Sequence, residues 1–160
     1  MRLHFFVLLL ALNLCSCDKN RVFDQNIDFE KQEWAEKTAL DFKFKVEDST
    51  VPYDLFYNVR YTNTYPYYNL YIGYILKDST GKEIKRNIPQ NMDLFNPTTG
   101  EPYGKGLGDL FECSILGLPS FKFPNKGVYT MQVKQYMRKD PISGIASFGL
   151  KVEKAETAKE

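Results

Sequence analysis

Apolar and polar residues alternate along much of the chain after residue 38. In the stretch ALDFKFKVE, Leu40, Phe42, Phe44 and Val46 share one parity and charged residues occupy the other. Side chains two positions apart lie on the same face of a strand, so this pattern predicts a strand with one buried and one wet face. Similar patterns predict further strands over residues 55–61, 70–76, 83–88, 110–116, 128–136 and 146–153.

The segments between these strands carry turn residues. Gly81 in the sequence DSTG supplies the positive φ that a hairpin with a bulge requires. Both faces of the strand at 70–76 are apolar, which predicts a central position in a sheet. Residues 89–108 hold three prolines and four glycines, so we expect an irregular segment that is functional or covers a sheet edge.

Many short strands with turns between them are typical of an all-β fold. We predict a single β-sandwich, jelly-roll or immunoglobulin-like in plan, over residues 38–154, followed by a charged tail at 155–160. Asp28 to Lys37, around Trp34, is expected to form a short helix with Asp28 as its N-cap.

The first sixteen residues have the features of a secretory signal. Arg2 precedes the apolar run from Phe5 to Leu12, which is shorter than the roughly 20 residues that span a bilayer. The sequence Leu14-Cys15-Ser16-Cys17 resembles a bacterial lipobox, and Cys17 fits the acylated position better than Cys15 does. We therefore predict a signal peptide over 1–16, a covalent lipid on Cys17 and a membrane tether over 17–37. Several acyl chains on one cysteine anchor a protein stably.

Charge and composition limit the chemistry. The formal net charge is +1, without the basic excess that nucleic-acid binding needs. The one histidine, His4, is removed with the signal peptide, which excludes Ser-His-Asp catalysis and histidine metal sites. We expect no cofactor and no metal. Cys113 lies in an alternating stretch, so we favour a buried strand thiol over a reactive one.

Paired carboxylates leave a glycosidase as a residual enzyme hypothesis, since two carboxyl groups suffice for that chemistry. Asp93, Glu101, Asp109 and Glu112 lie in or near the irregular segment. With 20 acidic residues in the chain, a solvated rim is the better interpretation.

Tyrosines are concentrated in one part of the chain: eight of the eleven fall between residues 53 and 74. Tyr57, Tyr61 and Tyr74 keep the apolar parity, and we expect them in the core. In the turn TNTYPYYN, surface exposure with a binding role and simple packing remain equally open. The candidate binding residues there are Tyr65, Tyr67 and Tyr68.

Charged residues near strand ends form a second candidate group. Arg60, Arg138 and Asp140, with Lys139, could form an ion-pair network or contact a partner. Exposed pairs of this kind contribute little to stability.

Three stretches together resemble the GldH family of gliding-motility lipoproteins of Bacteroidetes. They are the run from RVFDQNIDFEKQEW to YILKDSTGK, the segment GKGLGDLFE, and FPNKGVYTMQVKQYMRKDPISGIASFGLKVEK. The pieces VRYTNTYPYYNLY and QYMRKDPISGI are the most specific. The resemblance covers essentially the whole chain after the signal, with the segments in the same order.

The resemblance implies a lipoprotein of the cell envelope needed for the gliding apparatus and the linked type IX secretion system. It implies no enzymatic activity, and only the acylated cysteine carries over, to Cys17. Asp18 directly after Cys17 would indicate inner-membrane retention under enterobacterial sorting rules, which leaves that location as the alternative. No acidic run of the kind that accompanies surface export follows Cys17 in DKNRVF, and we expect attachment to the outer membrane, facing the periplasm.

Two functions follow as hypotheses. The first is a non-enzymatic, lipid-anchored envelope protein that supports motility and secretion through contacts with other envelope proteins. The alternative is a carbohydrate-binding module with Tyr65, Tyr67 and Tyr68 as a stacking platform.

Overall fold

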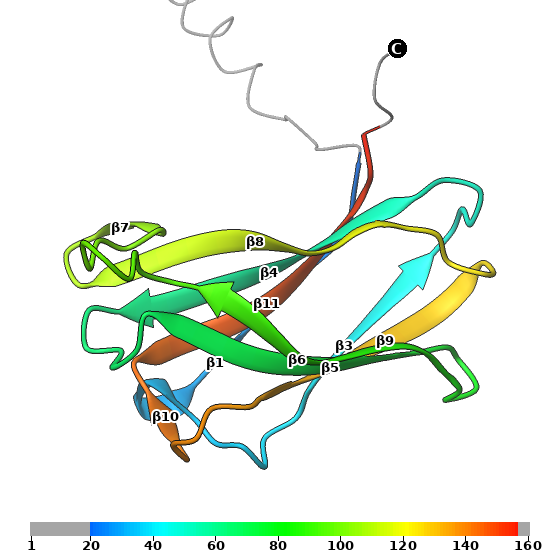
Figure 1. The fold of residues 1–160 in the computed structure, drawn as a ribbon. Helices are drawn as coiled ribbons and strands as arrows, with labels where there is room; N and C mark the ends of the chain where they lie inside the picture. Colours follow the sequence, from blue (N-terminus) through cyan, green and yellow to red (C-terminus); the bar gives the residue numbers. More distant parts are fainter. Residues whose placement is uncertain (1–19, 157–160) are drawn as a thin grey trace, which may run out of the picture.

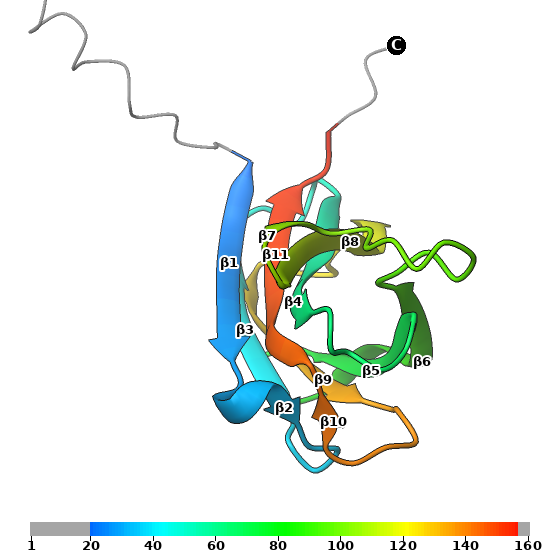
Figure 2. The ribbon, with the colours of Figure 1, turned by 90° about the vertical axis from the view of Figure 1, so that its left-hand side faces the viewer.

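The computed structural model describes residues 20–156. The predicted signal peptide, Cys17 and residues 157–160 lie outside this part of the chain. Two antiparallel sheets pack face to face as a sandwich, and no α-helix occurs among the described residues. Figure 1 and Figure 2 show the two layers from two sides. The all-β sandwich predicted from the sequence is confirmed.

The strands divide between two large sheets and one small ladder. The first sheet has the order β1 (Arg21–Asp28), β11 (Ile145–Lys154), β4 (Tyr53–Thr62), β8 (Leu110–Phe121) and β7 (Lys105–Leu107). The second has the order β3 (Leu40–Val46), β9 (Gly127–Gln135), β5 (Asn69–Lys77) and β6 (Glu83–Asp93). The ladder pairs β2 (Glu33–Trp34) with β10 (Ile142–Ser143).

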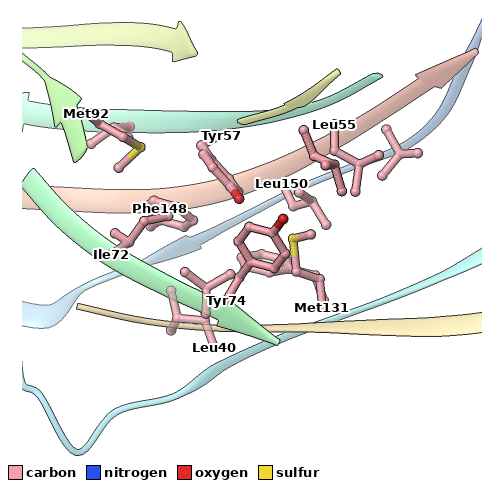
Figure 3. Close-up of a cluster of buried hydrophobic side chains, with 14 of the residues drawn as sticks. Leu40, Leu55, Tyr57, Ile72, Tyr74, Met92, Met131, Phe148 and Leu150 are labelled. Atoms are coloured by element: carbon pink, nitrogen blue, oxygen red, sulfur yellow. The ribbon is translucent and has the colours of Figure 1, made fainter. Parts of the chain in front are cut away.

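The core lies between the two large sheets. Inward-facing residues of both sheets meet there, and Figure 3 shows Tyr57 and Phe148 from one sheet opposite Tyr74 and Ile72 from the other. Tyr57, Tyr61 and Tyr74 are almost fully buried, as their parity predicts. Strand β5 lies between β9 and β6, which confirms its predicted interior position.

The N-terminal part of the domain differs from the prediction. Residues 21–28 form strand β1, hydrogen-bonded to β11, so the sandwich begins at Arg21 and not at residue 38. The helix expected around Trp34 is wrong: a single 3₁₀ turn (Glu30–Gln32) leads into β2. Trp34 is fully buried against Phe29 and Phe148, and that burial favours the extended backbone over a short helix.

The segment at 89–108 is more regular than expected. Strand β6 continues to Asp93, and residues 105–107 form β7, which pairs with the start of β8. Strand β8 also runs on to Phe121. The predicted turn at Gly81 is present, with φ of 85° and space around the glycine.

The two ends of the described chain lie together. The backbone N–H of Lys154 donates to the carbonyl of Asn20 at 2.9 Å. Strand β4 starts beside Lys154 at Tyr53 and ends at Thr62. At about 3.3 Å per residue, its ten residues carry the chain about 30 Å away. The tyrosine-rich turn after β4 therefore lies at the end of the sandwich remote from the termini (Figure 1).

Candidate functional site

The tyrosine turn, residues 63–68, joins β4 to β5. Its first tyrosine, Tyr65, is only 5% exposed. The Tyr65 backbone N–H donates to the carbonyl of Thr62 at 3.1 Å, and its hydroxyl donates to the carbonyl of Asn69 at 2.8 Å. The expectation that Tyr65 could be a surface residue is therefore wrong. Burial raises the pKa of its hydroxyl, which stays protonated and serves as a structural donor.

Gly144 explains why Tyr65 packs so closely. Its φ is 84°, and a Cβ there would approach the Tyr65 Cα to 2.6 Å. The Gly144 carbonyl accepts a hydrogen bond from Thr62 N–H at 2.9 Å. Gly144, far along the chain, thus allows the tyrosine turn to pack against it, because no other residue fits both its positive φ and the narrow space beside Tyr65.

The next two tyrosines are exposed, as one of the two sequence interpretations expects. Tyr67 is 37% and Tyr68 is 50% exposed. The Tyr67 ring meets the Tyr65 ring edge-on, with centroids 6.0 Å apart. The Tyr68 carbonyl accepts hydrogen bonds from the N–H groups of Leu94 and Phe95, at 2.8 and 2.9 Å. Hydrogen bonds therefore hold the backbone of Tyr68, and packing on Tyr65 supports the Tyr67 ring.

A loop after β6 faces the tyrosine turn. The Asn96 side-chain oxygen accepts from the N–H groups of Thr98 and Thr99, and the Gly100 N–H donates to the Asn96 carbonyl. Phe95 packs edge-on against Tyr61 with centroids 5.1 Å apart. Local hydrogen bonds and the half-buried ring of Phe95 thus order the part of the loop next to the tyrosines.

The Tyr61 hydroxyl connects this loop to the core. It donates to the carbonyl of Leu94 at 2.6 Å and accepts from the N–H of Gly104 at 2.9 Å. Burial raises the pKa of this phenol, so the donor persists through the ordinary pH range. The loop is consequently held at both Leu94 and Gly104 by one side chain.

Between the turn and the loop lies a shallow cleft of about 290 Å³. Aromatic rings, prolines and amides line it, and none of the lining residues is charged. Such a surface offers stacking area and hydrogen bonds. The lining residues are Asn63, Tyr65, Pro66, Tyr67, Tyr68, Phe95, Asn96, Pro97 and Gly100.

Sequence reasoning missed part of this cleft. Asn63, Phe95 and Asn96 belong to it, although Phe95 and Asn96 come from a different segment of the chain. The sequence carries no pairing signal between the two segments. The hydrogen bonds from Leu94 and Phe95 to Tyr68 involve only backbone atoms, which leave no trace in residue type.

The charged candidates do not form one network. The Arg60 guanidinium pairs with Glu112 at 3.2 Å on the exposed side of the sheet. Asp140 accepts a hydrogen bond from the Glu36 N–H at 2.7 Å, and Arg138 is exposed. None of the three lines the tyrosine cleft.

The four acidic residues considered for hydrolysis are held by separate partners. Asp109 accepts from the Asn63 amide at 2.8 Å, Asp93 from the Asn91 amide at 2.9 Å, and Glu101 from Thr99 at 3.3 Å. Glu112 pairs with Arg60. Within residues 20–156, no group of His, Cys, Asp or Glu has the arrangement of a metal site.

Cys113 lies half-buried on β8, with its inward side against the core. Burial raises the pKa of its thiol to about 11, so the nucleophilic thiolate is scarce at neutral pH. This agrees with the strand thiol favoured from the sequence. Cys17 lies outside the described residues, and no helix within 20–156 has the length and apolarity to cross a membrane.

Comparison with known proteins decides the family. The family model described as GldH lipoprotein matches residues 21–152. The chain belongs to the GldH lipoprotein family. The match starts at β1, in agreement with the boundary of the sandwich. Because this is a lipoprotein family, the chain is associated with a membrane of the cell envelope.

Two curated GldH relatives span nearly the whole chain. The gliding motility lipoprotein GldH homolog of Christiangramia forsetii is 32% identical, and 95% of each chain is covered. Gliding motility lipoprotein GldH of Flavobacterium johnsoniae is 31% identical, covering 94% of this chain and 95% of its own. Among solved structures, the infectious bursal disease virus VP2 subviral particle matches with a TM-score of 0.42 and 14% identity. That match covers 84% of this chain and 32% of the viral chain.

Proposed function

We propose that this chain is a non-enzymatic, lipid-anchored envelope protein that serves gliding motility and the linked type IX secretion system by docking to other envelope proteins. Membership of the GldH family and the names of its two relatives support the motility role. The observation that carries the docking role is the pair Tyr67 and Tyr68, exposed on a rigid turn.

The anchor in this proposal is a covalent lipid on Cys17 in the outer membrane, with the domain facing the periplasm. Asn20 is three positions after Cys17, and three extended Cα–Cα steps span at most about 11 Å. The end of the sandwich where the termini meet would therefore lie close to the bilayer. The tyrosine turn, at the opposite end of β4, would face away from it.

The anchor is tested by fractionation of cells that express the full chain or its Cys17→Ala variant. We expect the parent protein in the membrane fraction and the variant in the soluble periplasmic fraction. Membrane association that is unchanged by Cys17→Ala would contradict this part of the proposal.

Tyr67 and Tyr68 suit protein docking for two reasons. Tyrosine provides a large contact area with few rotatable bonds, and it is enriched among the residues that dominate binding energy. The backbone of Tyr68 is already held by hydrogen bonds from Leu94 and Phe95, and the Tyr67 ring packs on buried Tyr65, so binding would cost little ordering entropy.

The docking role is tested with a photocrosslinking amino acid placed at position 68 in the full-length lipoprotein in living cells. The control carries it at position 136, because Tyr136 is similarly exposed, at 42%, but lies just after β9 and outside the cleft. We expect crosslinks to motility or secretion proteins from position 68 only. Equal crosslinking from both positions would count against docking at the turn.

Carbohydrate binding is the second candidate, and the composition of the cleft favours it. Aromatic rings beside uncharged amides are a surface that sugars can stack on and hydrogen-bond to. A glycan array covering plant and peptidoglycan fragments separates the two functions. Binding that is lost in Tyr68→Ala would establish this alternative, and no binding across the panels would exclude it.

A further inference from the structure

One edge of the first sheet is open. Strand β8 pairs with β4 along its length, whereas on its other side β7 pairs only with residues 110–112. Residues 113–118 face no strand on that side among the described elements. Figure 2 shows β8 near the end of one layer, with β6 at the end of the other.

The direction of the free backbone groups follows from the β7–β8 hairpin. The carbonyl oxygens of Leu110 and Glu112 lie on the β7 side, since a Cβ at Gly106 or Gly104 would run into them. Along an antiparallel strand, every second residue directs its backbone N–H and C=O groups to the same neighbouring strand. Ser114 and Leu116 therefore direct their N–H and C=O groups to the same side, where no strand lies.

The side chains around this edge are apolar or neutral. Leu116 is 46% exposed on the outer face, and Cys113 and Ile115 are half-buried on the inner face. By contrast, the inward residues of the neighbouring strand β4, such as Tyr57 and Val59, are fully buried. An added strand would complete the coverage that β8 lacks.

Other edge strands carry the charges that discourage pairing. Strand β3 presents Asp41, Lys43 and Lys45, and β1 presents Arg21, Asp24 and Asp28. Strand β6 carries Glu83, Lys85, Arg86 and Asp93. Residues 113–121 of β8, CSILGLPSF, contain no charge. Charged edges resist strand addition, and an uncharged edge permits it.

The space beside the unpaired edge of β8, residues 113–118, here called the lane, has defined limits. At one end is β7, and at the other the Gln90 amide donates to the Gly117 carbonyl at 3.0 Å. Pro119 follows, which has no N–H to offer. An incoming strand therefore pairs chiefly with Ser114 and Leu116 and continues the direction of β7, antiparallel to β8.

The remaining parts of this chain are poorly suited to fill the lane. Every strand within residues 20–156 is already placed in one of the two sheets or in the β2–β10 ladder. The N-terminal segment enters the fold at β1, with β11 and β4 between it and β8. The occupant is therefore sought in another polypeptide.

We propose that residues 113–118 of β8 accept an extended, uncharged strand of a partner protein by addition to the sheet edge. Backbone hydrogen bonds to Ser114 and Leu116 would provide the pairing, and apolar side chains of the partner would cover Cys113 and Ile115. This surface is independent of the tyrosine turn.

The test measures hydrogen–deuterium exchange of the full-length lipoprotein in detergent. The probe is a blocked seven-residue peptide of alternating threonine and valine. Without peptide, at high dilution, we expect fast exchange of the Ser114 and Leu116 amides. Millimolar peptide should slow that exchange at least tenfold.

Two variants make the edge unfavourable and one serves as the matched control. Leu116→Lys and Ser114→Lys should each abolish the slowing, because they place a charge on the edge strand beside the lane. Asn87→Lys adds the same charge to the exposed edge strand β6 and should leave it unchanged. The double variant Tyr67→Ala/Tyr68→Ala should also leave it unchanged, which separates this proposal from docking at the tyrosine turn.

Three results would overturn the proposal. The first is that the peptide does not slow amide exchange at Ser114 and Leu116, or slows it as much in Leu116→Lys and Ser114→Lys as in the parent protein. Another is slow exchange at high dilution without peptide, which would mean that the edge is already closed. The third is slowing that grows with protein concentration alone, which would make a second copy of this chain the occupant.

Discussion

At the scale of single residues, the Tyr61 hydroxyl is the contact that ties the cleft to the core. It bonds the backbone of Leu94 and of Gly104, at the two ends of the loop. Tyr61→Phe leaves these groups without that partner, and we expect a loss of about 1–3 kcal/mol in the free energy of unfolding. Urea denaturation measures it. Tyr74→Phe is the control, since Tyr74 is equally buried and none of its hydrogen bonds anchors the loop. Equal losses in both variants would contradict the assigned role.

Gly144 provides a second test at this scale. Gly144→Ala combines a positive φ with a close approach to the Tyr65 backbone, whereas Gly81→Ala has a similar φ and open space. A non-glycine residue in this conformation costs roughly 1–2 kcal/mol. We expect that cost for Gly81→Ala and a clearly larger one for Gly144→Ala in thermal or urea unfolding. A smaller effect at Gly144 would mean that the tyrosine turn does not depend on this contact.

Cys113 predicts a pH dependence. Burial raises the pKa of the thiol from 9.0 to about 11, so the unfolded chain releases its proton first as pH rises. The stability associated with this thiol is fully present below pH 9 and is lost as pH rises through 11. Iodoacetamide labelling at pH 8 should be much slower in the folded protein than in urea. Equal labelling rates would show that the thiol is freely accessible.

At the scale of elements, the N-terminal strand is part of the fold and not a tether. Phe23 of β1 contacts Phe44 with ring centroids 5.8 Å apart, and Trp34 donates its indole N–H to the Thr38 carbonyl at 3.0 Å. Losing a buried aromatic side chain costs about 3–5 kcal/mol, a large share of the 5–15 kcal/mol that stabilises a typical domain.

A truncation series tests this conclusion. A chain that begins at Asn20 should unfold cooperatively in urea, followed by circular dichroism. A chain that begins at Thr38, the boundary predicted from the sequence, should lose that cooperative transition because it lacks β1 and Trp34. Similar unfolding of the two chains would restore the tether interpretation of residues 20–37.

Strands were predictable from the sequence where one face is buried and the other is wet. Strand β3 alternates buried and exposed residues without exception, so the pattern of its side chains reports its structure. Strand β1 lies at a sheet edge, where both of its faces stay partly exposed, and its residue pattern is irregular. A strand with both faces partly exposed leaves a weaker periodic signal because burial, and not backbone conformation, produces the alternation.

At the scale of the whole molecule, the same limit applies to the candidate site. Sequence identified the tyrosine-rich segment but could not separate buried Tyr65 from exposed Tyr67 and Tyr68, because Gly144 decides that difference. The sequence also contained no indication that Phe95 and Asn96 line the cleft. Residue type revealed the chemistry of the site, and the long-range packing that shapes it came only with the fold.

The central claim is that a membrane-anchored sandwich docks to envelope proteins through Tyr67 and Tyr68. Its most direct test is a crosslinked pull-down of the acylated protein from detergent-solubilised envelopes, quantified by mass spectrometry. Three forms are compared: the parent chain, Tyr67→Ala/Tyr68→Ala, and Tyr136→Ala as the exposed-tyrosine control. We predict that motility or secretion proteins are recovered with the parent and with Tyr136→Ala and are lost with the double variant. Equal recovery from all three forms would contradict the claim.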